Sequence, residues 1–302
     1  SLIFCCSLFL YLFFNKADRY IFSSGPITAS FPILFLKKYK TILEIRDLWP
    51  EGGFEMKKIP LFLKAPLFFI QKKIYHNTSR IITCSPAQKD AILNKYPKSN
   101  LNIDVIEHGL DPRVLEKSNE LYIKKIKNKN DQKYWVVVAT FGYIHNPFKW
   151  LNFAQKIHKV DSKIKLILIG SGPLLNDFKD QIKENKISNI ILTGQINKNE
   201  MSNWIQKADF CLFTTLNNKV QLTSAPNKIY DYMCFRKLIL IDLDMWLLRK
   251  YEGIIFKVDF ENFSESDLLF LNKKNNSKKT NEIYSKIIPS LYRNNLADIY
   301  LK

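Results

Sequence analysis

The stretch KLILIGSGP at residues 165–173 is a short apolar run that ends in a glycine-containing loop. Similar runs rich in Ile, Val, Leu and Phe recur along the 302-residue chain, and each is followed by a stretch with helical character. This alternation is typical of a parallel α/β fold. We expect strands at 19–23, 41–45, 80–84 and 103–107, and in the second half at 135–140, 165–169, 189–192, 210–213, 238–241 and 254–257.

Helices are predicted between these strands. Their expected positions are 26–38, 60–76, 86–95, 148–159, 173–185, 199–207 and 226–234. Ser85 and Pro86 favour a helix start, because Ser can cap the first free amides and Pro suits the first turn. The tail becomes amphipathic between Ile283 and Leu301.

A polar, lysine-rich segment at 117–133 divides the chain and is predicted to be a linker. The length also suits two domains. We predict Rossmann-like domains at 1–116 and 134–280, and a C-terminal helix at 281–302. Ligands of open α/β sheets bind beyond the carboxyl ends of the strands, and two such domains that face each other form a cleft. Chemistry is therefore expected on the loops that follow strands.

The chain is strongly basic, with 46 Lys+Arg against 28 Asp+Glu and a formal net charge of +18. This charge indicates an anionic partner, such as nucleic acid, acidic lipid or a phosphorylated substrate, or a general bias toward Lys and Asn. Nucleic acid is the less favoured partner, because the aromatic residues fall at core positions and not in a basic surface array.

The five cysteines form no C-x-x-C pair and the four His are scattered, so the spacing of a zinc site is absent. Free thiols in a reducing cytoplasm are expected. The run Leu2–Phe14 is apolar at twelve of thirteen positions. It is shorter than the about 20 residues of a bilayer-spanning helix and lacks signal-peptide features. It predicts a helix that is buried in the core or lies at a membrane surface.

The segment 223–232 follows a predicted strand and a polar loop and begins a helix. Ser224 and Asn227 are candidate caps of this helix. The free amides of a helix start suit a phosphate, and Lys228 in the first turn adds a positive charge. Asp231 lies one turn further on the same side and could accept hydrogen bonds from sugar hydroxyls. The alternative is an ordinary capped helix with surface Lys and Asp.

Three further segments follow predicted strands. The sequence Gly170-Ser-Gly-Pro and the later Gly194 allow tight turns and close approach of a ligand, but glycine is common in such loops. The run RDLWPE at 46–51 places charged groups and an indole at a strand end, which favours a functional role over salt-bridged loop packing. His108, within EHGLD at 107–111, is more often a structural residue.

In combination these segments resemble glycosyltransferase family 4, and in particular its bacterial polysaccharide and O-antigen branch. The resemblance covers nearly the whole chain. It lacks the family's first strand and glycine-rich loop, which, with the start at Ser1, predicts an amino-terminally truncated chain. The segments that carry it, in the family's order, are RDLWPE (46–51), SP (85–86), IEHGLD (106–111), GSGP (170–173), LTGQ (192–195) and SAPNKIYDYM (224–233).

The resemblance implies a GT-B fold of two Rossmann-like domains. The second domain would hold a nucleoside-diphosphate sugar and the incomplete first one the acceptor, and transfer would retain the anomeric configuration with no metal or other cofactor. Pro226, Asn227 and Lys228 match the diphosphate site and Asp231 the ribose site. The resemblance also implies nucleotide contacts at Gly142, Lys149, Gly170, Gly172 and Gly194, and a role near the transferred sugar for Arg46 and Asp47.

The expected function is therefore retaining glycosyl transfer from a UDP-sugar to a lipid-linked or saccharide acceptor in surface polysaccharide synthesis. The expected location is the cytoplasm, with contact to the inner face of an anionic membrane. Three departures from the family leave a degenerate, non-catalytic copy open: Thr223 stands eight positions before Asp231 where an acid is expected, Arg236 replaces a glycine, and Lys149 stands in for an arginine. A UDP-sugar epimerase is a further alternative.

Overall fold

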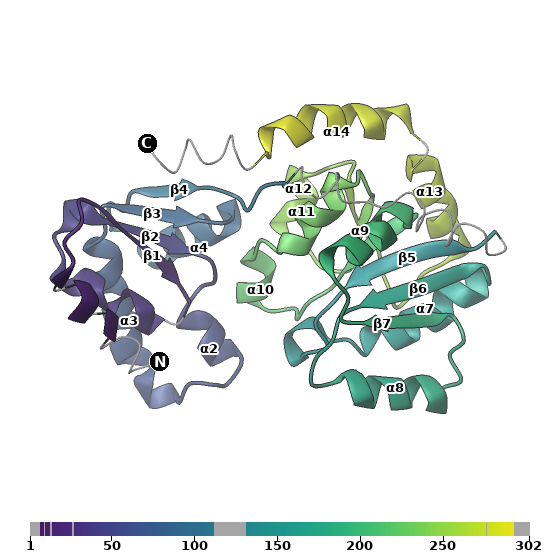
Figure 1. Cartoon of the computed structure of the whole chain (residues 1–302), viewed down its shortest axis with the longest axis horizontal. Helices are drawn as coiled ribbons and strands as arrows, with labels where there is room; N and C mark the ends of the chain where they lie inside the picture. The colour runs from purple at the N-terminus through teal and green to yellow at the C-terminus, as the bar shows by residue number, and fades with distance from the viewer. Residues whose placement is uncertain are drawn as a thin grey trace. The chain divides into compact units, whose positions relative to one another are not determined.

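The computed structural model describes residues 7–8, 10–12, 14–25, 27–111, 131–275 and 277–292, without the side chain of Tyr39. By their contacts these residues form two compact units. The first contains the residues up to His108 together with Asn218–Ala225, and the second contains Gly109–Asn217 and the described residues from Pro226 onward. Each unit is an α/β body with its own sheet (Figure 1).

The first unit is built on a four-stranded parallel sheet in the order β1-β2-β3-β4. The register pairs Tyr20 with Thr41, Ile42 with Arg80, and Ile81 with Ile103. The four strands are β1 (Tyr20–Ser24), β2 (Thr41–Ile45), β3 (Arg80–Thr83) and β4 (Ile103–Val105).

Apolar side chains from the strands and helices of the first unit form one core cluster around Leu43, Ile74 and Ile81. Val220 of α10 (Lys219–Thr223) belongs to this core, so a short helix from the second half of the sequence packs in the first unit. The helices of this unit between β1 and β4 are η1 (Ile27–Phe35), η2 (Lys38–Lys40), α2 (Glu51–Glu55), η3 (Leu61–Leu63), α3 (Lys64–His76) and α4 (Pro86–Lys95).

The second unit has a six-stranded parallel sheet in the order β10-β9-β8-β5-β6-β7. In chain order this is the doubly wound 3-2-1-4-5-6 arrangement of Rossmann folds, whose strand order reverses between β5 and β8. The strands are β5 (Lys133–Val138), β6 (Ile164–Ile169), β7 (Ile190–Gly194), β8 (Phe210–Phe213), β9 (Ile239–Ile241) and β10 (Ile255–Lys257).

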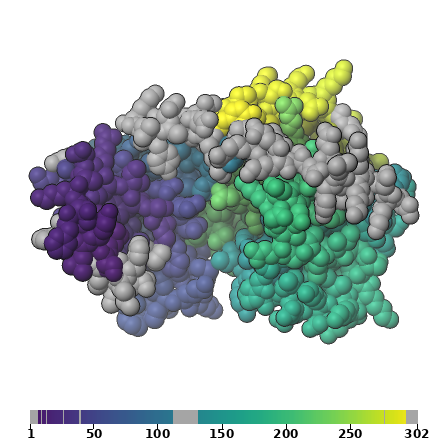
Figure 2. All heavy atoms as spheres, viewed as in Figure 1, coloured from purple at the N-terminus to yellow at the C-terminus, as the bar shows by residue number. Residues whose placement is uncertain are grey.

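An aromatic core holds the second unit together. Trp135 of β5 is fully buried, with its ring centroid 5.1 Å from that of Phe210 and 5.6 Å from that of Phe263. Figure 2 shows the side chains of this unit, coloured teal to yellow, packed closely over the surface. The helices are η4 (Tyr143–His145), α7 (Lys149–Val160), α8 (Leu175–Glu184), α9 (Lys198–Lys207), α11 (Asn227–Cys234), α12 (Trp246–Lys250), α13 (Glu265–Asn275) and α14 (Lys278–Ser290).

All ten predicted strands are present, most within two residues of the expected limits, and the predicted α/β class is correct. The prediction at 26–38 is corrected: this segment forms the 3-10 helix η1, with Pro32 inside it. Pro32 lacks the amide that an α-helix would need at that position. The short helices α2, α10 and α12 and the longer helix α13 were not predicted.

Several sequence predictions fall partly or wholly outside the described residues. These are most of the apolar run at 2–14, the linker at 117–130 and the tail beyond 292. In the described part of the run, Leu8 and Leu12 pack against the core of the first unit, whereas Leu10, Tyr11 and Phe14 are exposed. Among the described helices, none is long and apolar enough to cross a membrane.

Candidate functional site

The reversal point between β5 and β8 brings two loops of the second unit together. The amide of Leu216, after β8, donates to the carbonyl of Ile144, after β5, at 2.8 Å. The Thr215 hydroxyl donates to the same carbonyl at 3.1 Å. The carboxyl ends of the strands at a reversal point diverge and leave a crevice there, which is where open α/β sheets bind ligands. These loops, with the start of α11, form the candidate site.

Gly170 and Gly172 fit the loop after β6 against the backbone of the loop after β5. The Gly170 φ is +141°, and a Cβ atom on this residue would lie 1.8 Å from the Ala139 carbonyl oxygen. A Cβ on Gly172 would lie 2.5 Å from the carbonyl oxygen of Phe141. Close packing against the backbone of the loop after β5 is therefore enough to require glycine at both positions. Their predicted contact with a nucleotide stays a prediction.

Gly142 and Gly194 have open space instead. A Cβ on Gly142 would meet only a methyl group at 3.9 Å, and one on Gly194 would meet nothing within 4 Å. Gly194 has a φ of +69°, which L-residues rarely adopt, and its carbonyl accepts a hydrogen bond from the Gly170 amide at 2.9 Å. This hydrogen bond joins the loops after β6 and β7 along the same edge of the sheet.

The first turn of α11 has no side-chain cap. Pro226 is the N-cap residue with extended backbone, and it has no side chain that could accept a hydrogen bond from the amides of the first turn. The suggested caps are corrected: Asn227 is the first helical residue and is exposed, and the Ser224 hydroxyl donates to the Gln221 carbonyl at the end of α10. The two residues therefore lie outside the N-cap position, and the amides of this helix start are available to a ligand.

Lys228 is a half-buried cation in this first turn. Its Nζ lies 5.5 Å from the centroid of the Phe213 ring at the end of β8. In the part of the chain that the structure describes, no carboxylate forms an ion pair with Lys228. Burial lowers the pKa of its ammonium group to about 8. Because a cation near a helix start opposes the helix dipole, a bound anion would stabilise it.

His145 lies in the loop after β5 and was not among the predicted site residues. Its Nδ1 is buried and has no hydrogen-bond partner among the described residues. Burial and the charge of Lys228 lower the pKa of the ring to about 4, and the Thr214 backbone acts in the opposite direction. His145 is therefore neutral near pH 7. Its unprotonated ring nitrogen can accept a hydrogen bond. A lone His in a polar loop gave no signal in the sequence.

Lys149 is engaged within the protein. Its Nζ donates to Asp242 Oδ2 at 2.6 Å, and the Thr214 hydroxyl donates to Asp242 Oδ1 at 2.7 Å. Asp242 follows β9, and its side chain is largely buried. A nucleotide that contacts Lys149 would have to compete with Asp242 for its ammonium group. The nucleotide contact of Lys149 stays a prediction.

The end of α11 explains one departure from the family pattern. Arg236 has a φ of +52°, which is the left-handed conformation. Its amide donates to the Met233 carbonyl at 2.9 Å, and the next amide, of Lys237, donates to Tyr232 at 3.2 Å. This is a Schellman ending, at which glycine is the usual residue. Because the Arg236 side chain is exposed, it enters solvent without a steric clash at this turn. Asp231 is half-buried on the same helix.

In the first unit, Arg46 and Asp47 follow β2 and both are exposed. Their charges act on the buried thiol of Cys84, as do those of Glu44 and Glu107, so these groups lie at one edge of the sheet. Glu51 has a structural role: its carboxylate accepts from Lys95 Nζ at 2.5 Å and from Gln71 Nε2 at 3.0 Å. The RDLWPE segment thus combines two exposed charges with an anchored carboxylate.

No group of three or more His, Cys, Asp or Glu that could hold a metal occurs within the described residues. The protein groups available at the candidate site include the amides of the α11 start, the Lys228 ammonium group and the neutral His145 imidazole. The amides and the ammonium group suit an anion.

The architecture is that of the GT-B fold, with two Rossmann-like domains and parallel sheets. The chain is similar in structure to trehalose-6-phosphate from E. coli bound with UDP-2-fluoro glucose, with a TM-score of 0.73, 11% identity, and coverage of 99% of this chain and 76% of that one. It is also similar to Anabaena HepE in complex with UDP, with a TM-score of 0.71, 12% identity, and coverage of 98% and 80%.

Residues 135–241, which include most of the candidate site, match the family described as Glycosyl transferases group 1. A curated relative is the alpha-monoglucosyldiacylglycerol synthase of Streptococcus pneumoniae (strain ATCC BAA-255 / R6), 24% identical over 162 residues. The match covers 51% of this chain and 36% of the relative, so the chain spans little more than a third of that protein. These matches support a relationship to group 1 glycosyltransferases of the GT-B type.

Proposed function

We propose that this chain is a glycosyltransferase of family 4 that transfers a sugar, with retention, from a nucleoside-diphosphate sugar. A UDP-sugar is the favoured donor, and a lipid-linked or saccharide acceptor in surface polysaccharide synthesis is the favoured acceptor. The observation that carries the proposal is Lys228, a desolvated cation without an ion pair in the described chain, at an uncapped helix start beside the reversal point of a Rossmann sheet.

The chemistry of transfer needs positive charge where the nucleoside diphosphate leaves. In the proposed mechanism the amides of Asn227 and Lys228 and the Lys228 ammonium group stabilise that diphosphate, in place of a metal ion. His145, as a neutral imidazole, accepts a hydrogen bond from a sugar hydroxyl at its free ring nitrogen. Asp231 accepts from the ribose hydroxyls. Arg46 and Asp47 are proposed to act on the transferred sugar from the first unit.

A membrane-facing role is proposed for the segment 57–73, KKIPLFLKAPLFFIQKK, which contains η3 and most of α3. It carries five exposed lysines and no acidic residue. Leu61, Phe62 and Phe69 are 76%, 79% and 61% exposed. Exposed apolar side chains among cations suit the interface of an anionic bilayer, where the rings enter the headgroup region and the lysines contact lipid phosphates. A lipid-linked acceptor would be reached at such a surface.

Donor binding is tested by the melting temperature of the purified chain with UDP, GDP, ADP, CMP and their sugar conjugates, because a ligand of the folded state raises it. We expect a rise with UDP and UDP-sugars that Lys228→Ala abolishes. Lys179→Ala, at an exposed position of α8, is the matched control and should respond like the wild type. A cooperatively melting chain that responds to no nucleotide would contradict the proposal.

Membrane contact is tested by sedimentation with vesicles of phosphatidylglycerol and phosphatidylcholine. We expect binding that rises with the anionic fraction and falls in the variant Leu61→Ser/Phe62→Ser. Leu269→Ser, which removes an apolar side chain that is 64% exposed on α13, should bind like the wild type. Equal binding by all three proteins would exclude the segment 57–73 as the contact.

A further inference from the structure

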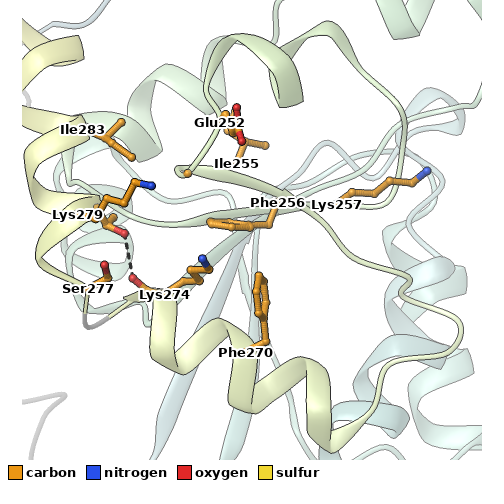
Figure 3. A pocket seen from close by; sticks show the side chains of 11 residues that line it. Glu252, Ile255, Phe256, Lys257, Phe270, Lys274, Ser277, Lys279 and Ile283 are labelled. Carbon is orange, nitrogen blue, oxygen red and sulfur yellow. Dashed lines mark hydrogen bonds between the residues drawn. The ribbon is translucent and has the colours of Figure 1, made fainter.

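A cavity of the second unit lies at the edge strand β10, away from the reversal point between β5 and β8. Its volume is about 580 Å³. Figure 3 shows that it is lined by residues of β10, of the turn before it, and of the facing ends of α13 and α14. The volume lies within the range of about 300–1,000 Å³ in which proteins hold small organic ligands.

Two ammonium groups enter this cavity from α13 and α14. Lys274 and Lys279 point into the same space (Figure 3), and neither forms an ion pair in the part of the chain that is described. The third lysine, Lys257, is paired with Asp244 at 2.6 Å and points away. The hydroxyl of Ser277 also lines the cavity. An anion bound in this space would be attracted by both ammonium groups.

The opposite wall is apolar. The rings of Phe256 and Phe270 meet edge to face with centroids 6.0 Å apart, and Lys274 Nζ lies 5.2 Å from the Phe270 centroid. Ile283 closes the α14 side. Glu252 lies across the space from Lys274 (Figure 3) and can accept a hydrogen bond from a ligand hydroxyl. The cavity therefore has cationic groups at one end and an apolar wall.

We propose that this cavity binds an organic phosphate, with the phosphate between Lys274 and Lys279 and the organic body against Phe256 and Phe270. A phosphate ester carries the charge that two ammonium groups and a hydroxyl satisfy together, and its body covers the exposed rings. A nucleotide, a sugar phosphate and a lipid headgroup share this chemistry. The site is separate from Lys228, so it does not depend on the proposed function.

The test is a ³¹P NMR titration of the intact chain with three probes: phenyl phosphate, uridine monophosphate and glucose 6-phosphate. We expect at least one probe to bind, and the variant Lys274→Ala/Lys279→Ala to weaken it by about tenfold or more. Lys278→Ala removes an exposed lysine of the same helix turn that does not line the cavity, and it should bind like the wild type.

Lys228→Ala separates the two sites. A probe bound at β10 should keep its affinity in Lys228→Ala. The probe that binds best indicates whether the organic part of the natural ligand is a nucleoside, a sugar or an apolar group. The proposal is overturned if no probe binds, or if binding survives Lys274→Ala/Lys279→Ala and is lost in Lys228→Ala. Because both lysines are accessible at the surface, the double variant should melt like the wild type, which calorimetry would check.

Discussion

The ammonium group of Lys228, in the first turn of α11, lies close enough to the ring of His145, in η4 after β5, to lower the pKa of that ring. Both groups are desolvated, and burial lowers both pKa values. A phosphate group bound beside this pair would offset the cost of burying the cation.

UDP binding should therefore depend on pH through Lys228. With a pKa of about 8 in the free protein, the ammonium group is largely charged at pH 7 and largely neutral at pH 9. We expect the affinity for UDP to fall about tenfold over this interval. Isothermal titration calorimetry at the two pH values measures the change. In Lys228→Arg the side chain stays charged, so the affinity should be nearly constant.

The same residue should reduce stability in the absence of ligand. The pKa of Lys228 is lower in the folded chain than its ordinary value of 10.5. The unfolded chain thus binds the proton more tightly, and the cost is fully present below about pH 8 and disappears as the pH rises toward 10.5. Lys228→Met should raise the melting temperature by a few degrees at pH 7 and by less at pH 10. An equal effect at both values would exclude desolvation as the cause.

His145 should titrate near pH 4 in the wild type and closer to its ordinary value of 6.5 in Lys228→Met. NMR of the imidazole signals would follow both titrations. Because the folded pKa is depressed, stability should decrease as the pH falls from about 6.5 to about 4. His145→Gln should remove this part of the pH dependence and also weaken UDP binding. An unchanged His145 titration in Lys228→Met would show that burial alone sets its pKa.

The sheets could be predicted from the sequence because buried parallel strands are short, continuous apolar runs. Phe210–Phe213 and Thr41–Ile45 match the predicted strands residue for residue, and Ser85 caps α4 as expected, accepting from the Gln88 amide. The short helices could not be predicted this way. Five residues such as 219–223 show little periodicity, and α10 is held by packing of Val220 in a core formed by distant residues.

The site was only partly predictable for the same reason. Glycines and a helix start are local signals, so Lys228 and Pro226 could be singled out. The partner of Lys149 lies 93 positions away and that of His145 lies 69 positions away, in the loops after β9 and β8, and only the fold brings Asp242 and Thr214 to them. The glycines at 170 and 172 were assigned to ligand approach, although backbone packing is sufficient to explain them.

Arg236→Gly should stabilise the protein. A non-glycine residue in the left-handed conformation costs about 1 kcal/mol or more, and the exposed Arg236 side chain sits in that conformation. We expect the free energy of unfolding to rise by about 1 kcal/mol in urea titrations. Arg236→Ala keeps the backbone strain and is the control, with little gain. If Arg236→Gly also lowers the affinity for UDP and Arg236→Ala does so equally, the guanidinium group contacts the ligand.

Substitution of Gly142 and Gly172 by alanine distinguishes a glycine required for packing from one required for ligand binding. Gly172→Ala places a methyl group against the Phe141 carbonyl and should destabilise the chain by about 2 kcal/mol. Gly142→Ala meets only a methyl group at 3.9 Å, and its φ of −125° suits any residue, so stability should change by less than about 0.5 kcal/mol. We expect Gly142→Ala nevertheless to weaken UDP binding, because the new methyl group occupies space where the ligand approaches the loop. Calorimetric unfolding and UDP titration of both variants decide this. Unchanged affinity in Gly142→Ala would place the nucleotide away from the loop after β5 and would count against the predicted role of this glycine.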